Sequence, residues 1–286
     1  MVERVGVVGS NGFIGKALKL ALEQTGTKVL GFNSSNAPLT IRGDLNEDLF
    51  QVHSIIWCAT KVNSAIAESS PDLVRVEVQK WETFISLWKK TSASRQVPII
   101  FMSSGGCVYS GSNIPFSESS TSTGTNAYGI MKSMMELILI EAEIPFKILR
   151  LANVYGPGQP TGRGQGVIAE WISSSKRKGV VDVYGSLDAF RDFIYIDDVT
   201  SAIISCIRVP NINDVFNIGS GKSTTLQEVL AEVRQLADKK LTVLHHKARS
   251  LDRQGYFLNI NKAILTLVWE PNIPLKQGMR NCWLND

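Results

Sequence analysis

The stretch Gly9-Ser10-Asn11-Gly12-Phe13-Ile14-Gly15 decides the fold of this 286-residue chain. It stands between an apolar run at residues 4–8 and a helical pattern that extends over residues 13–24. Its three glycines allow a tight turn, close approach of the backbone to phosphate, and packing of the helix on the strand. The amino end of the helix then presents free N–H groups to an anion. The stretch therefore predicts a site for the pyrophosphate of a dinucleotide.

Strand and helix patterns alternate over the first half of the chain. After the turn, strands are expected at residues 28–32, 54–59, 97–103 and 145–151, and helices at residues 71–90 and 126–143. This alternation predicts an α/β fold with a doubly wound parallel sheet and right-handed crossovers.

The pattern changes after residue 153, where a glycine-rich loop precedes a mixed order of elements. Helices are expected at residues 167–178 and 226–238, and strands at residues 181–184 and 193–196. We expect a dinucleotide-binding Rossmann domain over residues 1–152 and a smaller, mixed α/β substrate-binding region over residues 153–286. Segments near residues 193–218 are expected to return to the first domain.

The composition excludes several classes of function. The 30 basic and 26 acidic side chains give a net charge of +4 without a long basic run, so no nucleic-acid-binding surface is expected. No apolar run approaches the ~18 residues of a membrane span, and the first strand begins too early for a signal peptide. The four cysteines lie far apart and lack metal-binding spacing with the three histidines. They predict reduced thiols in a cytoplasmic protein, and no metal site.

The second decisive motif is Tyr128-Gly129-Ile130-Met131-Lys132, in the helix expected at residues 126–143. Tyr128 and Lys132 are four residues apart and therefore share one helix face. A phenol is a weak acid, so we expect the ammonium of Lys132, together with a positive nicotinamide, to lower the pKa of Tyr128 toward neutrality. The motif predicts proton transfer coupled to hydride transfer at a carbonyl carbon.

The residues after the second strand bear on the choice between NAD and NADP. NAD-binding chains usually carry an acid there that binds the ribose 2′-hydroxyl, whereas this chain has Asn33 and Ser34. The missing acid removes repulsion of a 2′-phosphate, but the next basic residue is Arg42, well beyond the strand. NAD and NADP both stay open, with the missing acid favouring NADP. Asp44 is expected to contact the adenine.

Five further segments carry a family resemblance. They are Ser103-Ser-Gly-Gly-Cys-Val-Tyr109, Arg150-Leu-Ala-Asn-Val-Tyr-Gly-Pro157, Arg191-Asp-Phe-Ile-Tyr-Ile-Asp-Asp198, Phe216-Asn-Ile-Gly-Ser-Gly221 and Arg249-Ser-Leu-Asp252. With the two motifs, they make nearly the whole chain resemble the extended short-chain dehydrogenase/reductases. Within that family, the chain resembles the nucleotide-sugar epimerases, dehydratases and reductases of carbohydrate biosynthesis, such as UDP-glucose 4-epimerase.

The resemblance implies roles for individual residues. Tyr128 would be the acid–base, and Lys132 would hold the nicotinamide ribose. Asn153, Arg191 and Arg249 would bind the diphosphate of a nucleoside-diphosphate sugar, a role that suits the charge of the two arginines. The residues expected to contact NAD or NADP are Gly9, Asn11, Gly12, Phe13, Ile14, Gly15, Asn33, Ser34, Asp44, Leu45, Ala59, Ser103, Tyr128 and Lys132.

The sequence departs from the family at its catalytic Ser or Thr, which usually stands three residues before the Val of the Val-Tyr pair. Here that residue is Gly105, and Ser104, one position away, is the candidate for the catalytic hydroxyl. The two acids that dehydratases carry before the Val are replaced by Gly106 and Cys107. Because elimination needs an acid and a base there, dehydration is disfavoured.

Three interpretations stay open. The first, which the sequence as a whole favours, is an NAD(P)-dependent nucleotide-sugar epimerase, in which hydride leaves C4, the keto sugar rotates, and hydride returns to the other face. The second is an NADPH-dependent nucleotide 4-keto-sugar reductase, which the missing acid after the second strand favours. The third is a non-catalytic dinucleotide-binding sensor, which would not need Tyr128 and Lys132. A homodimer through the helices at residues 71–90 and 126–143 is also expected.

Overall fold

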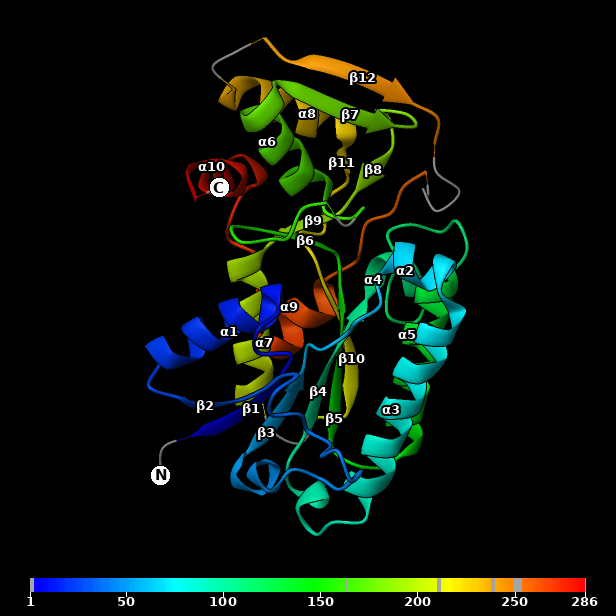
Figure 1. The fold of residues 1–286 in the computed structure, drawn as a ribbon, viewed down its shortest axis with the longest axis vertical. Helices are drawn as coiled ribbons and strands as arrows, with labels where there is room; N and C mark the ends of the chain where they lie inside the picture. Colours follow the sequence, from blue (N-terminus) through cyan, green and yellow to red (C-terminus); the bar gives the residue numbers. More distant parts are fainter. Residues whose placement is uncertain (1–2, 163, 210–211, 238–239, 249–253, 286) are drawn as a thin grey trace.

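The computed structural model describes residues 3–162, 164–209, 212–237, 240–248 and 254–285. Its larger part is a parallel sheet with helices on both faces, and its smaller part lies beyond one edge of that sheet (Figure 1). Among the residues that the structure describes, no helix is both long and apolar enough to cross a bilayer.

The central sheet contains six strands in the spatial order β10-β5-β4-β3-β1-β2, and all neighbours are parallel. The strands are β1 (Arg4–Val8), β2 (Lys28–Phe32), β3 (Ser54–Trp57), β4 (Ile99–Ser104), β5 (Phe146–Leu151) and β10 (Asp214–Ile218). β3 and β5 are buried along their whole length, as expected of strands that helices cover on both faces. The predicted α/β fold with a doubly wound parallel sheet is confirmed.

Two layers of helices enclose the sheet (Figure 1). One layer contains α2 (Ser64–Ser69), α3 (Pro71–Lys89) and α5 (Ala127–Glu141), and the other contains α1 (Phe13–Gln24), α7 (Ile196–Arg208) and α9 (Asn261–Leu267). Trp81, Phe84 and Trp88 anchor α3 because their side chains are fully buried. The indole N–H of Trp81 donates to the carbonyl oxygen of Met135 at 2.9 Å, which fixes α3 against α5.

The smaller part has its own apolar core, to which Trp171, Leu230 and Met279 contribute. Its elements are β6 (Asn153–Tyr155), α6 (Val167–Lys178), β7 (Val180–Tyr184), β8 (Phe190–Arg191), β9 (Phe193–Tyr195), β11 (Thr224–Thr225), α8 (Leu226–Leu236), β12 (Thr242–His246) and α10 (Leu275–Asn285). Short elements elsewhere are η1 (Glu47–Gln51), η2 (Ala93–Arg95) and α4 (Gly105–Val108). The division into two domains at residues 152 and 153 stays a prediction.

Candidate active site

The predicted site residues gather at the carboxyl edge of the sheet. The glycine-rich turn follows β1, residues 58–63 follow β3, and α4 follows β4. In open parallel sheets, ligands bind in the crevice outside this edge. The smaller part of the molecule lies over the same edge (Figure 1), so it can supply substrate contacts.

The glycine-rich turn packs so tightly that two of its glycines exclude any side chain. Gly9 has a φ of +87°, and a Cβ there would lie 2.7 Å from the backbone nitrogen of Ala59. A Cβ at Gly15 would overlap the carbonyl oxygen of Gly9. Gly9 and Gly15 are therefore required by the packing of the turn itself. The predicted residue Ala59 meets the turn through this close backbone approach.

Gly12 is different, because its Cβ would approach only the carbonyl oxygen of Gly9, at 3.2 Å. Gly12 is the exposed N-cap of α1 and has no side chain to cap the helix. The N–H groups of the first turn, which includes Phe13 and Ile14, can therefore bind an anion. Exposed Asn11 adjoins this opening. The cradle fits the pyrophosphate of a nicotinamide dinucleotide.

The predicted contacts after β2 lie in one loop that is held by hydrogen bonds. The Asn33 Oδ1 accepts the N–H of Ser35 at 2.9 Å, so this side chain is engaged in the turn. Ser34 is exposed beside it. Asp44 is exposed on the returning limb of the loop, and Leu45 is half-buried there. The loop places no carboxylate directly after β2.

Lys132 lies in a buried position on α5, one helical turn after Tyr128. Its Nζ donates to the carbonyl oxygen of Met102 at 2.9 Å. The same nitrogen lies 4.7 Å from the ring centre of Phe101 and 5.8 Å from that of Tyr128. The side chain of Asn126 caps the start of this helix and so fixes where Tyr128 stands. The structure thus brings the predicted acid–base and ammonium together.

The pKa of Tyr128 is raised above its ordinary value, chiefly by burial and then by the charges of Cys107 and Glu77. The prediction that Lys132 and a positive nicotinamide together lower this pKa stays a prediction. The ammonium of Lys132 lies over the phenol ring and donates to Met102, while burial removes the water that would stabilise a phenolate. Tyr128 is therefore a protonated phenol at neutral pH.

Burial acts in the opposite direction on Lys132 and lowers its pKa to about 8. Nearby negative charge opposes this shift, first from Glu77 and then from Glu136 and Cys58. The ammonium is therefore mostly charged at neutral pH, although it is buried.

Ser103 belongs to a buried polar network beneath the site. Its hydroxyl donates to Glu136, which forms an ion pair with Arg150 at 2.6 Å. Arg150 also donates to the hydroxyl of Ser122 at 3.2 Å. The network ties the end of β4 to α5 and β5. The hydroxyl of Ser103, a predicted cofactor contact, is thus bonded within the protein.

Ser104 ends β4, is half-buried, and does not cap α4 with its side chain. The next residue, Gly105, faces Leu258, because a Cβ there would lie 2.8 Å from the Leu258 Cδ1. Leu258 therefore fills the space that a serine side chain would need at position 105. The role of Ser104 as the replacement hydroxyl stays a prediction.

Tyr256 enters the site from the C-terminal part of the chain. A Cβ at Gly106 would overlap the Tyr256 hydroxyl, so only glycine leaves room for the phenol. The Asn153 Nδ2 donates to the same hydroxyl at 2.6 Å. Tyr256 thereby links the predicted substrate residue Asn153 to the segment that follows β4.

Arg191 lies beside the segment that carries Tyr256. Its Nη1 donates to the carbonyl oxygens of Phe190 at 2.8 Å and Gln254 at 3.5 Å. These bonds use neutral acceptors, so the positive charge can still attract a phosphate. The third predicted phosphate residue, Arg249, lies outside the described residues.

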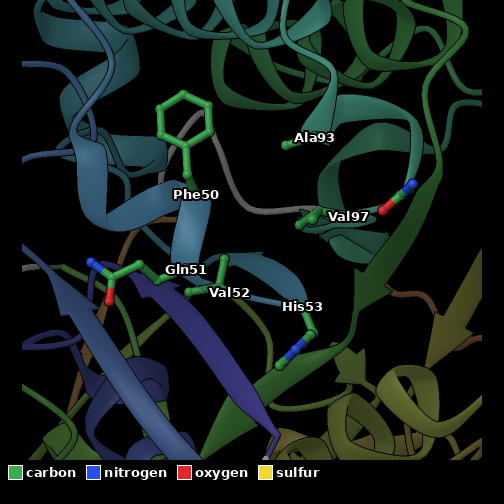
Figure 2. A pocket seen from close by; sticks show the side chains of 7 residues that line it. Phe50, Gln51, Val52, His53, Ala93 and Val97 are labelled. Atoms are coloured by element: carbon green, nitrogen blue, oxygen red, sulfur yellow. The ribbon is translucent and has the colours of Figure 1, made fainter.

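A surface hollow of about 330 Å³ lies at the other end of the strands (Figure 2). It is lined by Phe50, Gln51, Val52, His53, Ala93, Gln96 and Val97. His53 precedes β3 and Val97 precedes β4, which places the hollow at the amino edge of the sheet. It is therefore separate from the candidate active site.

Family comparison agrees with this geometry. Residues 5–219 match the "NAD dependent epimerase/dehydratase family". The chain belongs to this family. The predicted family and enzyme class, and a nicotinamide dinucleotide as cofactor, are confirmed at this level.

Individual relatives in the NAD-dependent epimerase/dehydratase family differ in the reaction that their names describe. A dTDP-4-dehydro-6-deoxyglucose reductase of Escherichia coli is 28% identical over 297 residues, covering 96% of this chain and 94% of the relative. A putative UDP-glucose 4-epimerase of Methanocaldococcus jannaschii is 30% identical over 187 residues, covering 64% and 60%. The crystal structure of a Thermotoga maritima UDP-glucose 4-epimerase with UDP-glucose has the same fold, with a TM-score of 0.83 at 24% identity. That similarity covers 99% of this chain and 98% of the other.

Sequence reasoning missed three residues of the site. Tyr256 could have been found, because it closely follows the family-like segment that ends at Asp252. Leu258 and Glu77 carry no motif, and only the folded chain brings them to the site.

Gly12→Val should weaken binding of NADPH and NAD by at least about ten-fold, because the added methyl groups would occupy the mouth of the cradle. The fold should persist, since a Cβ at Gly12 meets only one backbone atom. Calorimetric titration measures the affinity, and a thermal melt checks the fold. Gly15→Val is the matched control and should lower the melting temperature, because its Cβ overlaps Gly9. Unchanged affinity in the Gly12 variant would exclude the turn as a dinucleotide site.

Proposed function

We propose that the protein is an NADPH-dependent reductase of nucleoside-diphosphate 4-keto sugars. The observation that carries this proposal is the similarity, over almost the whole of both chains, to the dTDP-4-dehydro-6-deoxyglucose reductase of Escherichia coli. The sequence alone favours the epimerase, and this similarity reverses that order. The substrate class that follows is a dTDP-linked 4-keto-6-deoxy sugar.

The protonation of Tyr128 supports the reductive direction. Reduction of a carbonyl needs a proton donor at the oxygen, and a phenol whose pKa is raised holds its proton at neutral pH. Oxidation of a C4 hydroxyl needs a phenolate as base, which burial disfavours.

The loop after β2 supports NADPH. Asn33 is bonded to Ser35 and Ser34 is exposed, so no carboxylate repels a 2′-phosphate directly after the strand. Exposed Arg42 on the same loop adds positive charge.

Bound NADPH would supply the hydride that reduces the C4 carbonyl carbon. Tyr128 would donate its phenolic proton to the carbonyl oxygen as negative charge develops there. The ammonium of Lys132 would stabilise the resulting phenolate, which then regains a proton from solvent. Ser104 would donate a hydrogen bond to the same carbonyl oxygen and orient the sugar.

A nucleotide-sugar 4-epimerase is the second candidate, and the putative epimerase relative at 30% identity supports it. Membership of an enzyme family argues against the non-catalytic sensor.

For the substrate we propose that Asn153 and Arg191, with Arg249, contact the diphosphate. The wide spacing of the four cysteines along the chain supports a cytoplasmic location.

We also propose that two copies form a homodimer through α3 and α5. Ile130, Met134 and Leu137 are exposed on α5 at helical spacing, and Leu73 and Val76 are exposed on α3. Apolar side chains gathered on one helix face favour association with a second apolar surface.

The reductase should oxidise NADPH when it is mixed with dTDP-4-dehydro-6-deoxyglucose, and should not interconvert UDP-glucose and UDP-galactose.

Tyr128→Phe should fold and bind NADPH normally, while turnover falls by about 10²–10⁴-fold because the proton donor is lost. Absorbance at the NADPH band and chromatography of the sugar nucleotides measure both reactions. Ser104→Ala should lower turnover less than Tyr128→Phe does, because Tyr128 still supplies the proton. Epimerisation without net NADPH oxidation would favour the second candidate, and full turnover of Tyr128→Phe would exclude the mechanism.

Arg191→Ala should raise the KM for the sugar nucleotide by about ten-fold or more, because one charge-assisted bond to the diphosphate is lost. The turnover number should change little, since Arg191 does not donate the proton. Arg208→Ala, an exposed arginine at the end of α7, is the control and should match the parent. An unchanged KM for Arg191→Ala would remove Arg191 from the substrate site.

Leu137→Glu should convert the dimer to a monomer, because it buries a carboxylate in an apolar contact. Sedimentation velocity measures the molecular mass. Leu20→Glu is the control, since Leu20 is also exposed but lies on α1. A parent protein that sediments as a monomer, or a Leu137 variant that stays dimeric, contradicts the proposed interface.

A further inference from the structure

Two hydrogen bonds hold the side-chain amide of Asn153, the half-buried first residue of β6. Its Nδ2 donates to the Tyr256 hydroxyl at 2.6 Å and to the carbonyl oxygen of Asp192 at 3.1 Å. A carboxamide nitrogen carries two hydrogens, so each acceptor can take one of them. The two bonds therefore fix the plane of the carboxamide and keep its nitrogen and oxygen from exchanging places.

The first acceptor, the carbonyl oxygen of Asp192, is fixed by the surrounding backbone. It also accepts the backbone N–H of Asn153 at 2.9 Å. The side chain of Asp192 is fully buried, and its carboxylate accepts hydrogen bonds from Ser220, Gly221 and Leu258. This acceptor cannot move without breaking that network.

The second acceptor, the Tyr256 hydroxyl, is fixed by packing. Tyr256 is almost fully buried, and its backbone N–H donates to the carbonyl oxygen of Phe190 at 3.4 Å. A Cβ at Gly106 would overlap the hydroxyl and would lie 2.6 Å from the ring carbon Cζ. Gly106 thus leaves room for a phenol whose oxygen meets Asn153.

The packing explains the ring of Tyr256 but not its hydroxyl. A phenylalanine would fill the same space beside Gly106 except for the oxygen. The oxygen adds an acceptor for the second N–H of Asn153. Its contribution is therefore the orientation of that carboxamide.

We propose that Tyr256 is a positioning residue for substrate binding, whose hydroxyl holds the Asn153 carboxamide in the orientation that meets the sugar nucleotide. This inference rests on the proposed function, in which Asn153 contacts the substrate. Tyr256 acts through Asn153 and takes no part in proton donation, which stays with Tyr128. Loss of the hydroxyl should therefore weaken binding of the sugar nucleotide and leave the chemical step intact.

The first test is Tyr256→Phe, assayed with NADPH and dTDP-4-dehydro-6-deoxyglucose. The KM for the sugar nucleotide should rise about three- to ten-fold, the range expected for one lost hydrogen bond. The turnover number and the affinity for NADPH should change little, because the proton donor and the glycine-rich turn are untouched. Tyr184→Phe, at an exposed tyrosine on β7, is the matched control and should equal the parent. An unchanged KM for Tyr256→Phe, or an equal rise in the control, would overturn the proposal.

The second test is a double-mutant cycle with Asn153→Ala. In that background Tyr256→Phe should raise the KM no further, because no carboxamide is left to orient. A merely structural role of Tyr256 would raise the KM by the same factor in both backgrounds, and that result would contradict the proposal.

A thermal melt shows whether each variant is folded at the assay temperature. If Tyr256→Phe is not, Gly106→Ala replaces it in the cycle, because the added methyl group overlaps the Tyr256 hydroxyl and displaces it from Asn153. Gly106→Ala should raise the KM in the parent background and not in Asn153→Ala. The same rise in both backgrounds would again overturn the proposal.

Failure of the proposed reductase is a separate result. If the parent does not reduce the keto sugar, calorimetric titration of the same variants with dTDP-glucose and with UDP-glucose measures substrate affinity directly. Losses of affinity that depend on Asn153 would then support the role of Tyr256, although the reductase is excluded. A parent that binds neither sugar nucleotide would overturn both proposals.

Discussion

The ammonium of Lys132 must stay charged while it is buried, and several groups around it stabilise that charge. Removal of an isolated charge from water is costly, so a buried ammonium needs acceptors and negative charge nearby. The structure supplies the carbonyl oxygen of Met102, the ring face of Phe101 and the carboxylates of Glu77 and Glu136. Each comes from an element that is fixed by other packing. The bond from Lys132 to Met102 is therefore one of the contacts that fix α5 against β4.

The ion pair of Glu136 and Arg150 stabilises the same arrangement from below. Both side chains are almost fully buried, and such a pair contributes mainly because loss of one partner leaves the other charge uncompensated. Glu136 also accepts the hydroxyl of Ser103, and Arg150 lies over the ring of Tyr109. These contacts join β4, β5 and α5 into one unit. The acid–base thus stands on a rigid support, which a proton donor needs if its hydroxyl is to reach one atom of the substrate.

Local patterns made the central fold and two motifs predictable. The glycine-rich turn and the Tyr128–Lys132 spacing are read within one turn or one helix, and both lie where they were expected. β10 was missed because its strand pattern is interrupted by Asn217, a buried amide that donates to carbonyl oxygens from two distant loops. The sequence analysis also missed helix α7. The acids in its first turn and the apolar residues at helical spacing after residue 196 do indicate a helix there.

The sequence shows Lys132 beside Tyr128 but not the burial of the phenol, which raises its pKa. Glu77, Tyr256 and Leu258 come from segments far along the chain, and no local pattern places them. Position 105 shows the consequence most clearly. The sequence shows only that position 105 lacks a serine. The structure shows that Leu258 fills the space beside Gly105.

Side chains of the C-terminal segment pack against the glycines after β4. Gly105 and Gly106 leave space that Leu258 and Tyr256 fill, and neither position could carry a larger residue without displacing its partner. A substitution at position 105 or 106 is therefore coupled by volume to Leu258 or Tyr256, because protein interiors are closely packed. Leu258 thus adds an apolar side chain there and Tyr256 a phenol, and that phenol accepts a hydrogen bond from Asn153. The Tyr256 hydroxyl therefore stands beside Gly106, whereas apolar Leu258 fills the space beside Gly105. The polar lining after β4 thus depends on a residue from the C-terminal segment.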